Sequence, residues 1–237
     1  SQHDGDYEAA ARYISRALQL APNDDRVLNS AAVLLQDLNR NDEALRIYKL
    51  LVRRDPVNPT TYHNLAIAQY SAGNLDAAAA TLDQSLTLSA DMILASWWRA
   101  FMHCAQEEFE ACLAGYESLA DKTGQERFRV LGQASAYPGL GREAEGAAAL
   151  AELERIYVDD FPYIIASLHA RRGNTEVALD WFEKAYELDG RAGIGYVTRD
   201  PQLAFLLDEP RMQALLEIAG LSQEELDAVE FNVDLPG

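Results

Sequence analysis

The stretch RNDEALRIYKLLVRRDPVN, residues 40–58, decides the fold of this chain. Within it, the small residue Ala44 is followed four and seven residues later by the apolar Tyr48 and Leu51. Because an α-helix makes one turn in about 3.6 residues, these three side chains share one face of a helix. Pro56 follows where the helix must stop, since proline cannot continue the hydrogen-bond ladder. The stretch therefore predicts a helix with a small–large–small apolar stripe.

The same stripe returns with a period of 34 residues, which indicates internal repeats. The small residue keeps this spacing in four copies, and two later copies align after a shortening of two residues. We call each set of aligned residues a column, and the first column contains Ala10, Ala44, Ala78, Cys112, Ala144 and Ala178. The next two columns contain Ile14, Tyr48, Leu82, Tyr116, Ala148 and Phe182, and then Ala17, Leu51, Ser85, Leu119, Ala151 and Ala185. Small residues on the facing helices are Ala32, Ala66, Ala100, Gly132 and Ala166. We expect Ala66 and Ala100 to lie where paired helices cross, and Ala79 to be exposed.

The periodic segments predict helices, and turn residues separate them. Gly5, Gly73 and Gly173 fall between paired helices, while Pro22 and Pro56 close two repeats. No segment alternates with period two over a convincing length, so the sequence predicts an all-α fold. The expected helices lie near residues 6–20, 25–38, 41–54, 59–72, 75–88, 92–105, 108–120, 125–138, 142–156, 161–172 and 175–188, with two or three short helices after residue 199.

These columns resemble the tetratricopeptide repeat, and the resemblance covers residues 1 to about 190. It implies a right-handed superhelical solenoid of about six helix-turn-helix repeats with a short helical C-terminal cap. We expect residues 1–22 to hold the second helix of a truncated first repeat, residues 23–190 the repeats, and residues 191–237 the helical cap and tail. Because the first helix lacks a partner and no initiator Met is present, we interpret the chain as processed or excised from a longer protein.

The C-terminal part carries a second resemblance. It is similar to the terminal repeat and cap of bacterial tetratricopeptide modules, which in multidomain regulators follow a winged-helix domain, a nucleotide cyclase or a Ser/Thr kinase. None of those effector signatures occurs here. The matching residues are Gly173, Ala178, Leu179, Trp181, Ala185, Tyr186, Asp200, Pro201, Leu206, Pro210, Arg211, Leu215, Leu216, Gly220 and Leu221.

The tail is expected to be helical and to cover the last hairpin, as a solenoid end requires. Two short helices are predicted at Arg199–Leu207 and Arg211–Ala219, and their apolar side chains supply the cover. Ser222 and Glu225 make a capping-box start for a final helix. We therefore expect the cap to act locally, on the last repeat.

Composition and charge limit the classes of function. The chain has 237 residues, 49% of them hydrophobic, which is enough to bury a continuous core. Its formal charge of −18 argues against nucleic-acid binding, because phosphate contact requires a basic face. No apolar run approaches the length of a membrane span, so no membrane insertion is expected. The expected compartment is the cytoplasm, with the periplasm open if the chain comes from a membrane-anchored regulator.

Catalysis and metal binding are not expected, and no cofactor is predicted. His63, His103 and His169 fall on first helices of repeats, away from any Ser or Cys nucleophile motif, and His3 lies near the start. The two cysteines, Cys104 and Cys112, make no disulfide framework and lack further zinc ligands at suitable spacing. They are interpreted as structural. The prediction is therefore that the chain is not an enzyme.

The resemblance also implies a binding groove, because first helices of this repeat line the concave face. The residues that match its inward-facing positions are Asn29, Val33, Gln36, His63, Ile67, Tyr70, Trp97, Phe101, Arg129, Gln133 and Tyr163. Trp97 and Phe101 are one turn apart and should form one platform, while Trp98 is expected in the core. The alternative is that the platform packs against the adjacent hairpin or the chain's own tail. The lysine of the family's carboxylate clamp is missing, so chaperone-tail binding is not expected.

The predicted function is that of a protein–protein interaction module or scaffold that binds a peptide or partner domain, as part of a bacterial regulator. Two alternatives stay open. One is a self-associating structural segment, a homo-oligomer whose aromatic groove is filled by a second copy. The other is a non-catalytic module that positions substrate for a separate catalytic domain.

Overall fold

The computed structural model describes residues 7–234, and every regular element in that range is helical. The predicted all-α fold is confirmed. The repeat helices are α1 (Tyr7–Leu20), α2 (Asp25–Asp37), α3 (Asn41–Arg54), α4 (Pro59–Ser71), α5 (Leu75–Leu88), α6 (Ile93–Ala105), α7 (Phe109–Thr123), α8 (Glu126–Ala136), α9 (Glu143–Ile156), α10 (Pro162–Arg171) and α11 (Thr175–Asp189). They are followed by α12 (Arg191–Ile194), the 3₁₀ helices η1 (Val197–Arg199) and η2 (Ala204–Leu206), α13 (Pro210–Ala219) and α14 (Gln223–Asp227).

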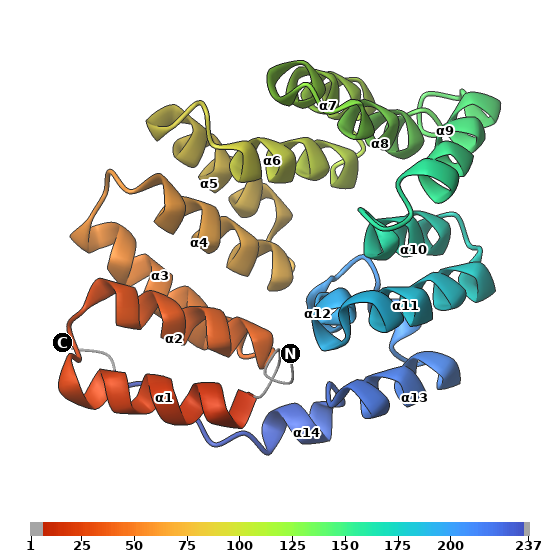
Figure 1. Cartoon of the computed structure of the whole chain (residues 1–237). Helices are drawn as coiled ribbons and strands as arrows, with labels where there is room; N and C mark the ends of the chain where they lie inside the picture. Colours follow the sequence, from red (N-terminus) through yellow and green to blue (C-terminus); the bar gives the residue numbers. More distant parts are fainter. Residues whose placement is uncertain (1–6, 235–237) are drawn as a thin grey trace.

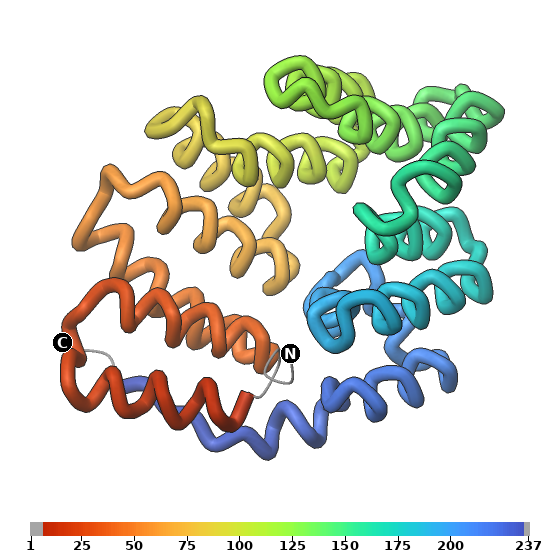
Figure 2. The backbone as a smooth tube through the Cα atoms, in the orientation of Figure 1, coloured from red at the N-terminus to blue at the C-terminus, as the bar shows by residue number. Residues whose placement is uncertain are grey.

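Successive helices pair as hairpins, and the hairpins follow one another in a curve that forms an almost closed ring (Figures 1 and 2). Polar N-cap side chains fix the start of two helices. The Asp24 carboxylate accepts hydrogen bonds from the backbone N–H groups of Arg26 and Val27 at the start of α2. One repeat later, the Asn58 side chain accepts hydrogen bonds from Thr60 and Thr61 at the start of α4. Each hairpin stacks on the next through its apolar stripe. The buried core therefore runs along the whole array rather than forming one central cluster.

The turn inside each hairpin fixes the repeat register. A residue with positive φ occupies the same place in every turn; these residues are Asn39, Gly73, Glu107, Gly141 and Gly173. The first four are 34 residues apart, so the repeat keeps its period through Gly141 and shortens by two residues only afterwards. The alignment of Ala144 in the sequence analysis is therefore displaced by two residues.

The structure corrects the stripe of α9 accordingly. The buried residues of this helix are Gly146, Ala149, Leu150 and Leu153, whereas the predicted stripe residues Ala144, Ala148 and Ala151 are exposed. The connection between α7 and α8 is two residues shorter than its equivalents, and the turn at residues 137–142 compensates by being longer. The spacing of the small residues in the sequence indicates the shortening but not the compensation.

The residues after α11 behave differently from a simple cap, and we call residues 191–234 the C-terminal strap. The predicted helix Arg199–Leu207 is wrong, because this part consists of turns and two 3₁₀ segments. The capping box of Ser222 and Glu225 is confirmed at the start of α14. Buried apolar residues of the strap cover α11, and they also join the core of the first repeats; these residues are Ile194, Val197, Leu203, Leu206, Met212, Leu226 and Phe231.

Polar contacts tie the C-terminal strap across the ring to the N-terminal repeats. The Arg199 guanidinium donates to the Asp37 carboxylate of α2 at 2.7 Å. Arg40 donates to the backbone carbonyl of Phe231. Figure 1 shows the last helices returning beside α1. The strap therefore holds the two ends of the solenoid together, which a cap acting only on the last repeat would not do.

Replacing Ala66 with leucine tests the helix-crossing column. Ala66 is 1% exposed on α4, and added methylenes in such a contact displace side chains or backbone. We expect the free energy of unfolding to fall by about 1–3 kcal/mol, measured by thermal or chemical denaturation. The predicted exposure of Ala79 is wrong, since it is buried, so Ala80→Leu on the exposed side of α5 is the matched control. Equal stability of the two variants would contradict the assigned crossing.

Candidate functional site

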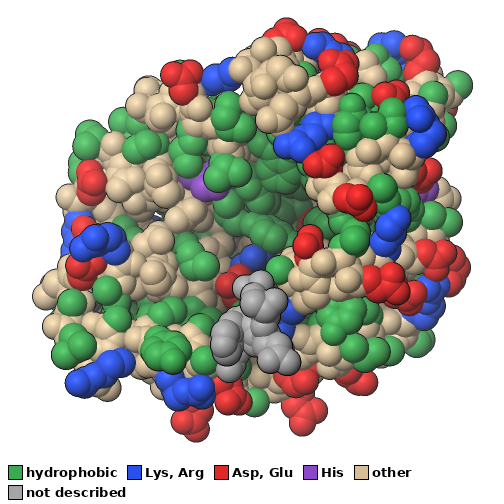
Figure 3. Space-filling view, in the orientation of Figure 1, with side chains coloured by type: hydrophobic (Ala, Val, Ile, Leu, Met, Phe, Trp, Pro, Cys, Tyr) green, Lys and Arg blue, Asp and Glu red, His purple; other side chains and the backbone are tan. Residues whose placement is uncertain are grey.

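The inner face of the ring contains a hollow lined by hydrophobic side chains (Figure 3). We call it the concave pocket; its volume is about 370 Å³, and its walls come from α4, α6, α7, α8, α10, α11 and the C-terminal strap. Cavities of about 300–1,000 Å³ are typical of ligand sites. Its aromatic lining includes Tyr70, Trp97, Trp98, Phe101, Tyr163 and Tyr196.

Four of these side chains form what we call the aromatic wall: Tyr70, Trp97, Trp98 and Phe101. The Trp97 and Phe101 rings are stacked with an interplanar angle of 10° and centroids 6.2 Å apart, so they form the single platform expected from their spacing. Trp98 is buried and meets both rings edge-on, as its predicted core position requires. Such perpendicular contacts add to the stability of packed aromatic groups. The platform is therefore rigid, while Trp97 and Phe101 stay partly exposed.

Asp200 of the C-terminal strap lies against the same wall. The Tyr70 hydroxyl donates to one Asp200 carboxylate oxygen at 2.5 Å, and the Tyr163 hydroxyl lies 3.4 Å from the other. Burial is the main cause that raises the pKa of both phenols, and the Asp200 charge adds to it. Both tyrosines are therefore neutral hydrogen-bond donors. Asp200 places a buried carboxylate at the pocket and attaches the strap to α4 and α10.

The structure separates the predicted groove residues into two groups. Tyr70, His63 and Gln36 are buried, at 1%, 5% and 4% exposure, so they are not open to a partner in this conformation. Trp97, Phe101, Tyr163, Ile67, Asn29, Arg129 and Gln133 are partly exposed, and Val33 is 40% exposed. Among them, Trp97, Phe101 and Tyr163 line the concave pocket together with the buried Tyr70. The other predicted groove residues do not line it; these are Asn29, Val33, Gln36, His63, Ile67, Arg129 and Gln133.

Most polar groove residues already have partners within the chain. The Arg129 guanidinium pairs with Asp121 at 2.6 Å and with Glu126 at 3.0 Å. Asn29 accepts a hydrogen bond from the Asn64 amide at 2.9 Å. A ligand would have to displace these contacts in order to use the same atoms.

His63 has an unusual environment on α4. Burial lowers its pKa to about 4, because a charged imidazole would be desolvated there. Its Nδ1 atom has no hydrogen-bond partner within the described part of the chain. The ring is therefore a neutral, buried group at neutral pH rather than a cationic contact for a ligand.

Several residues that line the pocket were not predicted from the sequence, and three of them are Tyr196, Arg171 and Asp200. Tyr196 contacts the rings of Trp98 and Tyr163, with centroids 5.7 and 6.3 Å away. Arg171 lies 5.6 Å from the centre of the Phe101 ring, and its Nη1 atom donates to the Gln202 side chain at 2.9 Å. Asp200 was noted only as part of a terminal-repeat match. Nothing periodic marks these positions, because each depends on how the C-terminal strap crosses the ring.

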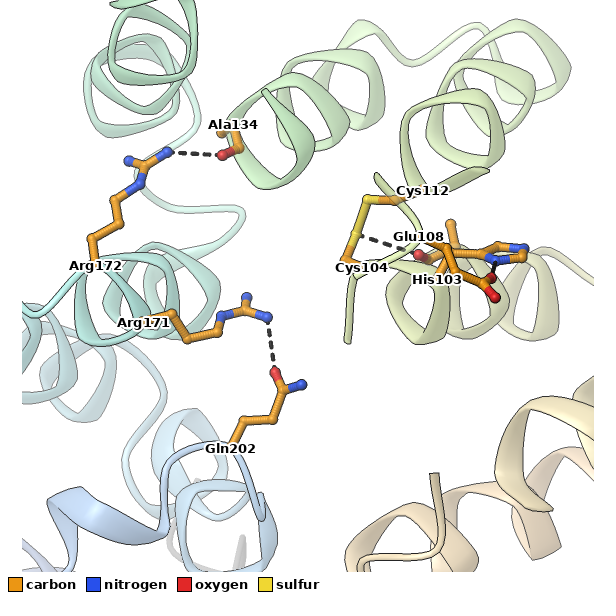
Figure 4. The surroundings of a disulfide bond; sticks show 9 residues. His103, Cys104, Glu108, Cys112, Ala134, Arg171, Arg172 and Gln202 are labelled. Atoms are coloured by element: carbon orange, nitrogen blue, oxygen red, sulfur yellow. Dashed lines mark hydrogen bonds and ion pairs between the residues drawn. A yellow bond between two sulfur atoms is a disulfide. The ribbon is translucent and has the colours of Figure 1, made fainter. Parts of the chain in front are cut away.

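Cys104 and Cys112 form a disulfide bond, which the sequence analysis did not predict (Figure 4). Their Cα atoms are 5.0 Å apart, since Cys104 lies in the last turn of α6 and Cys112 in the first turn of α7, on either side of a short connection. This distance lies within the range that a disulfide spans. The bond closes the hairpin that carries Trp97 and Phe101 on its first helix.

The described residues offer no arrangement for metal chemistry. Within residues 7–234, no group of three or more His, Cys, Asp or Glu side chains could hold an ion. His103 pairs with Glu108 and His169 with Glu154, each at 2.5 Å, as isolated pairs; His3 lies outside the described residues. Among the helices in this range, none combines the length and apolar character needed to cross a bilayer.

Stacked antiparallel helix pairs around one concave surface define a helical-repeat solenoid. Residues 2–66 and 59–92 match two family models described as tetratricopeptide repeat. Together with the 34-residue helical hairpins, these matches identify the chain as a tetratricopeptide repeat protein. Such repeats are protein–protein interaction scaffolds and are generally non-catalytic, so the chain belongs to that class of protein.

One protein of similar sequence and several solved structures of similar fold resemble this chain. The protein FlbA of Caulobacter vibrioides is 28% identical over 142 residues, which cover 59% of this chain and 24% of FlbA. The chain thus spans about a quarter of the length of that relative. A tetratricopeptide repeat protein from Parabacteroides merdae superposes with a TM-score of 0.65 at 15% identity, covering 92% of this chain and 79% of its own. The type IV pilus biogenesis factor PilW superposes at 0.58 and 16% identity, covering 89% and 91%. These two structures share the fold.

Proposed function

We propose that this chain is a non-catalytic scaffold that docks a segment of a partner protein in the concave pocket, against the aromatic wall. The observation that carries the proposal is the partial exposure of Trp97 and Phe101 beside an open cavity. Water in contact with such rings is unfavourable, and rigid aromatic side chains are enriched among residues that dominate binding energy. A partner side chain that fills the cavity would remove this surface from water.

The rim of the concave pocket supports the same proposal. Arg171 and Tyr163 present polar groups beside the apolar floor, as in sites where a few polar atoms orient a mostly apolar ligand. Ile67, Gln133 and Val33 lie on neighbouring repeats and would contact residues that flank the docked side chain. The buried Tyr70, His63 and Gln36 would support these surfaces from behind. Asn29 and Arg129 would contribute only after exchanging their present partners.

The two ring variants Trp97→Ala and Phe101→Ala test the docking site. Each should weaken a true partner by about 2 kcal/mol or more, as truncation of a hot-spot aromatic residue does. The measurements are recovery of partners from source lysate and titration of each recovered partner with the purified variants. Tyr13→Ala removes a ring that is 78% exposed on α1, outside the pocket, and serves as the matched control.

Three results would contradict the docking site. Retention of every partner by both ring variants would exclude the concave pocket. Equal losses in the Tyr13→Ala control would show that any exposed aromatic residue matters. Thermal unfolding of each variant distinguishes loss of binding from loss of folding. If both ring variants are unfolded, Trp97 and Phe101 are residues of the core rather than of a docking site.

We propose further that the chain works inside a larger bacterial regulator. The resemblance of its terminal repeat to regulator modules and its match to a quarter of FlbA support this context. Because disulfides persist in oxidising compartments, the Cys104–Cys112 bond favours the periplasm over the cytoplasm. Thiol labelling of the protein from its source cells, with and without reductant, tests this placement.

A further inference from the structure

We propose that the group held in the concave pocket is the guanidinium of a partner's arginine side chain; the inference rests on the docking function and adds the chemistry of the ligand. Cations are attracted to the faces of aromatic rings, and tryptophan attracts them most strongly. Arginine adds planar stacking, which a lysine ammonium cannot provide. The platform of Trp97 and Phe101 offers such a flat, partly exposed surface.

Charges around the concave pocket favour a cation. Three carboxylates line it, from Asp160, Asp189 and Asp200, against one guanidinium from Arg171. Asp160 is neutralised by Arg127 at 2.6 Å, whereas the exposed side chain of Asp189 has no hydrogen-bond or ion-pair partner within residues 7–234. The chain as a whole carries a formal charge of −18. Both the local and the long-range field therefore attract a basic segment and repel an acidic one.

Within the pocket, the Arg171 guanidinium lies over an aromatic ring, and Arg127, which is not one of the lining residues, lies over another ring of the lining. Arg171 lies 5.6 Å from the ring centre of Phe101, Arg127 lies 5.7 Å from that of Phe161, and both rings line the cavity. No cation of the described chain lies over the Trp97 ring. These contacts give the geometry that we expect for the partner: a guanidinium over Trp97, with its charge toward Asp189.

The tryptophan indoles provide a direct readout of binding. The chain has three tryptophans; Trp97 and Trp98 line the concave pocket, whereas Trp181 does not and serves as an internal control. The probes are N-acetylarginine amide, its uncharged analogue N-acetylcitrulline amide, and N-acetylglutamate amide, titrated into ¹⁵N-labelled protein. We expect the arginine probe to shift the Trp97 and Trp98 Nε1–H signals saturably, with little change at Trp181. Citrulline should bind about tenfold more weakly, since it lacks the charge.

Two variants of equal net charge separate a pocket contact from general attraction to an acidic protein. Asp189→Asn should weaken the arginine probe about fivefold, whereas Glu187→Gln, an exposed site two residues away and outside the pocket lining, should not. Equal loss in both variants would overturn the inference, because the attraction would then be long-range only.

The other outcomes separate this inference from the docking function. Equal shifts with arginine and citrulline would overturn the cation assignment while leaving the pocket as a binding site. If the glutamate probe bound more strongly than the arginine probe, the pocket would be a site for an anion at Arg171. This result would overturn the cation assignment as well. If no probe moves the pocket indoles, the arginine assignment fails, and the partner titrations with Trp97→Ala still decide the docking function.

Discussion

Replacing Phe231 with alanine is expected to lower the free energy of unfolding by about 3–5 kcal/mol. The side chain is 2% exposed and belongs to the core cluster that contains residues of α2 and α3. Its removal would leave a cavity where the C-terminal strap meets the first repeats, and surrounding atoms collapse only partly into such cavities. Chemical denaturation measures the loss.

Phe205 provides a matched control within the same strap. It is 51% exposed, and Phe205→Ala is expected to change stability by no more than about 0.5 kcal/mol. Because Phe231 packs at the N-terminal repeats, its loss should also speed amide exchange in α2 and α3. If Phe231→Ala were as mild as Phe205→Ala, the strap would not hold the ring closed, and the helical cap would act only on the last repeat.

The contact of the strap with the first repeats changes the energetics expected of a solenoid. An open repeat array is stabilised by contacts between neighbouring repeats, so damage at one end stays near that end. Here Arg199 pairs with Asp37, and Arg40 holds the Phe231 carbonyl, across more than half of the chain length. The first and last repeats should therefore lose structure together.

Local spacing was sufficient to predict the helices of the repeats, though not those of the C-terminal strap. Ala44, Tyr48 and Leu51 lie on one buried face of α3 because three residues separated by four and seven positions can face only one side of a helix. The same reasoning succeeded for the platform of Trp97 and Phe101, whose side chains extend from adjacent turns of α6. These features depend on residues a few positions apart in the sequence.

Two kinds of feature could not be predicted in this way. The first is the buried stripe of α9, which was predicted two residues too early in the sequence. The alanines Ala144, Ala148 and Ala151 have the spacing of a buried stripe, although all three are exposed. Gly141 marks the true register, because it keeps the 34-residue spacing of the turn residues Asn39, Gly73 and Glu107. The hydrogen bond from Tyr70 to Asp200 joins residues 130 positions apart, and no spacing rule relates them.

Replacing Asp200 with alanine is expected to lower the free energy of unfolding by about 2–4 kcal/mol. Its carboxylate accepts hydrogen bonds from the Tyr70 hydroxyl at 2.5 Å and from the backbone N–H of Gln202 at 3.0 Å, and it lies 3.4 Å from the Tyr163 hydroxyl. Removing it would leave buried donors without an acceptor, and each such donor costs about 1–3 kcal/mol. Asp200→Asn should cost less, because the amide oxygen can still accept from Tyr70. Denaturant titration of the variants measures these differences.

A double-mutant cycle with Tyr70→Phe separates the hydrogen bond from other effects of losing Asp200. The two residues are in direct contact, so we expect a coupling energy of about 0.5–3 kcal/mol. Asp208→Ala, an exposed acid in the same strap, is the control and should be nearly neutral. An Asp200→Ala variant as stable as this control would show that the carboxylate does not attach the strap to α4. A more stable variant would show that the cost of burying the charge exceeds what its hydrogen bonds contribute.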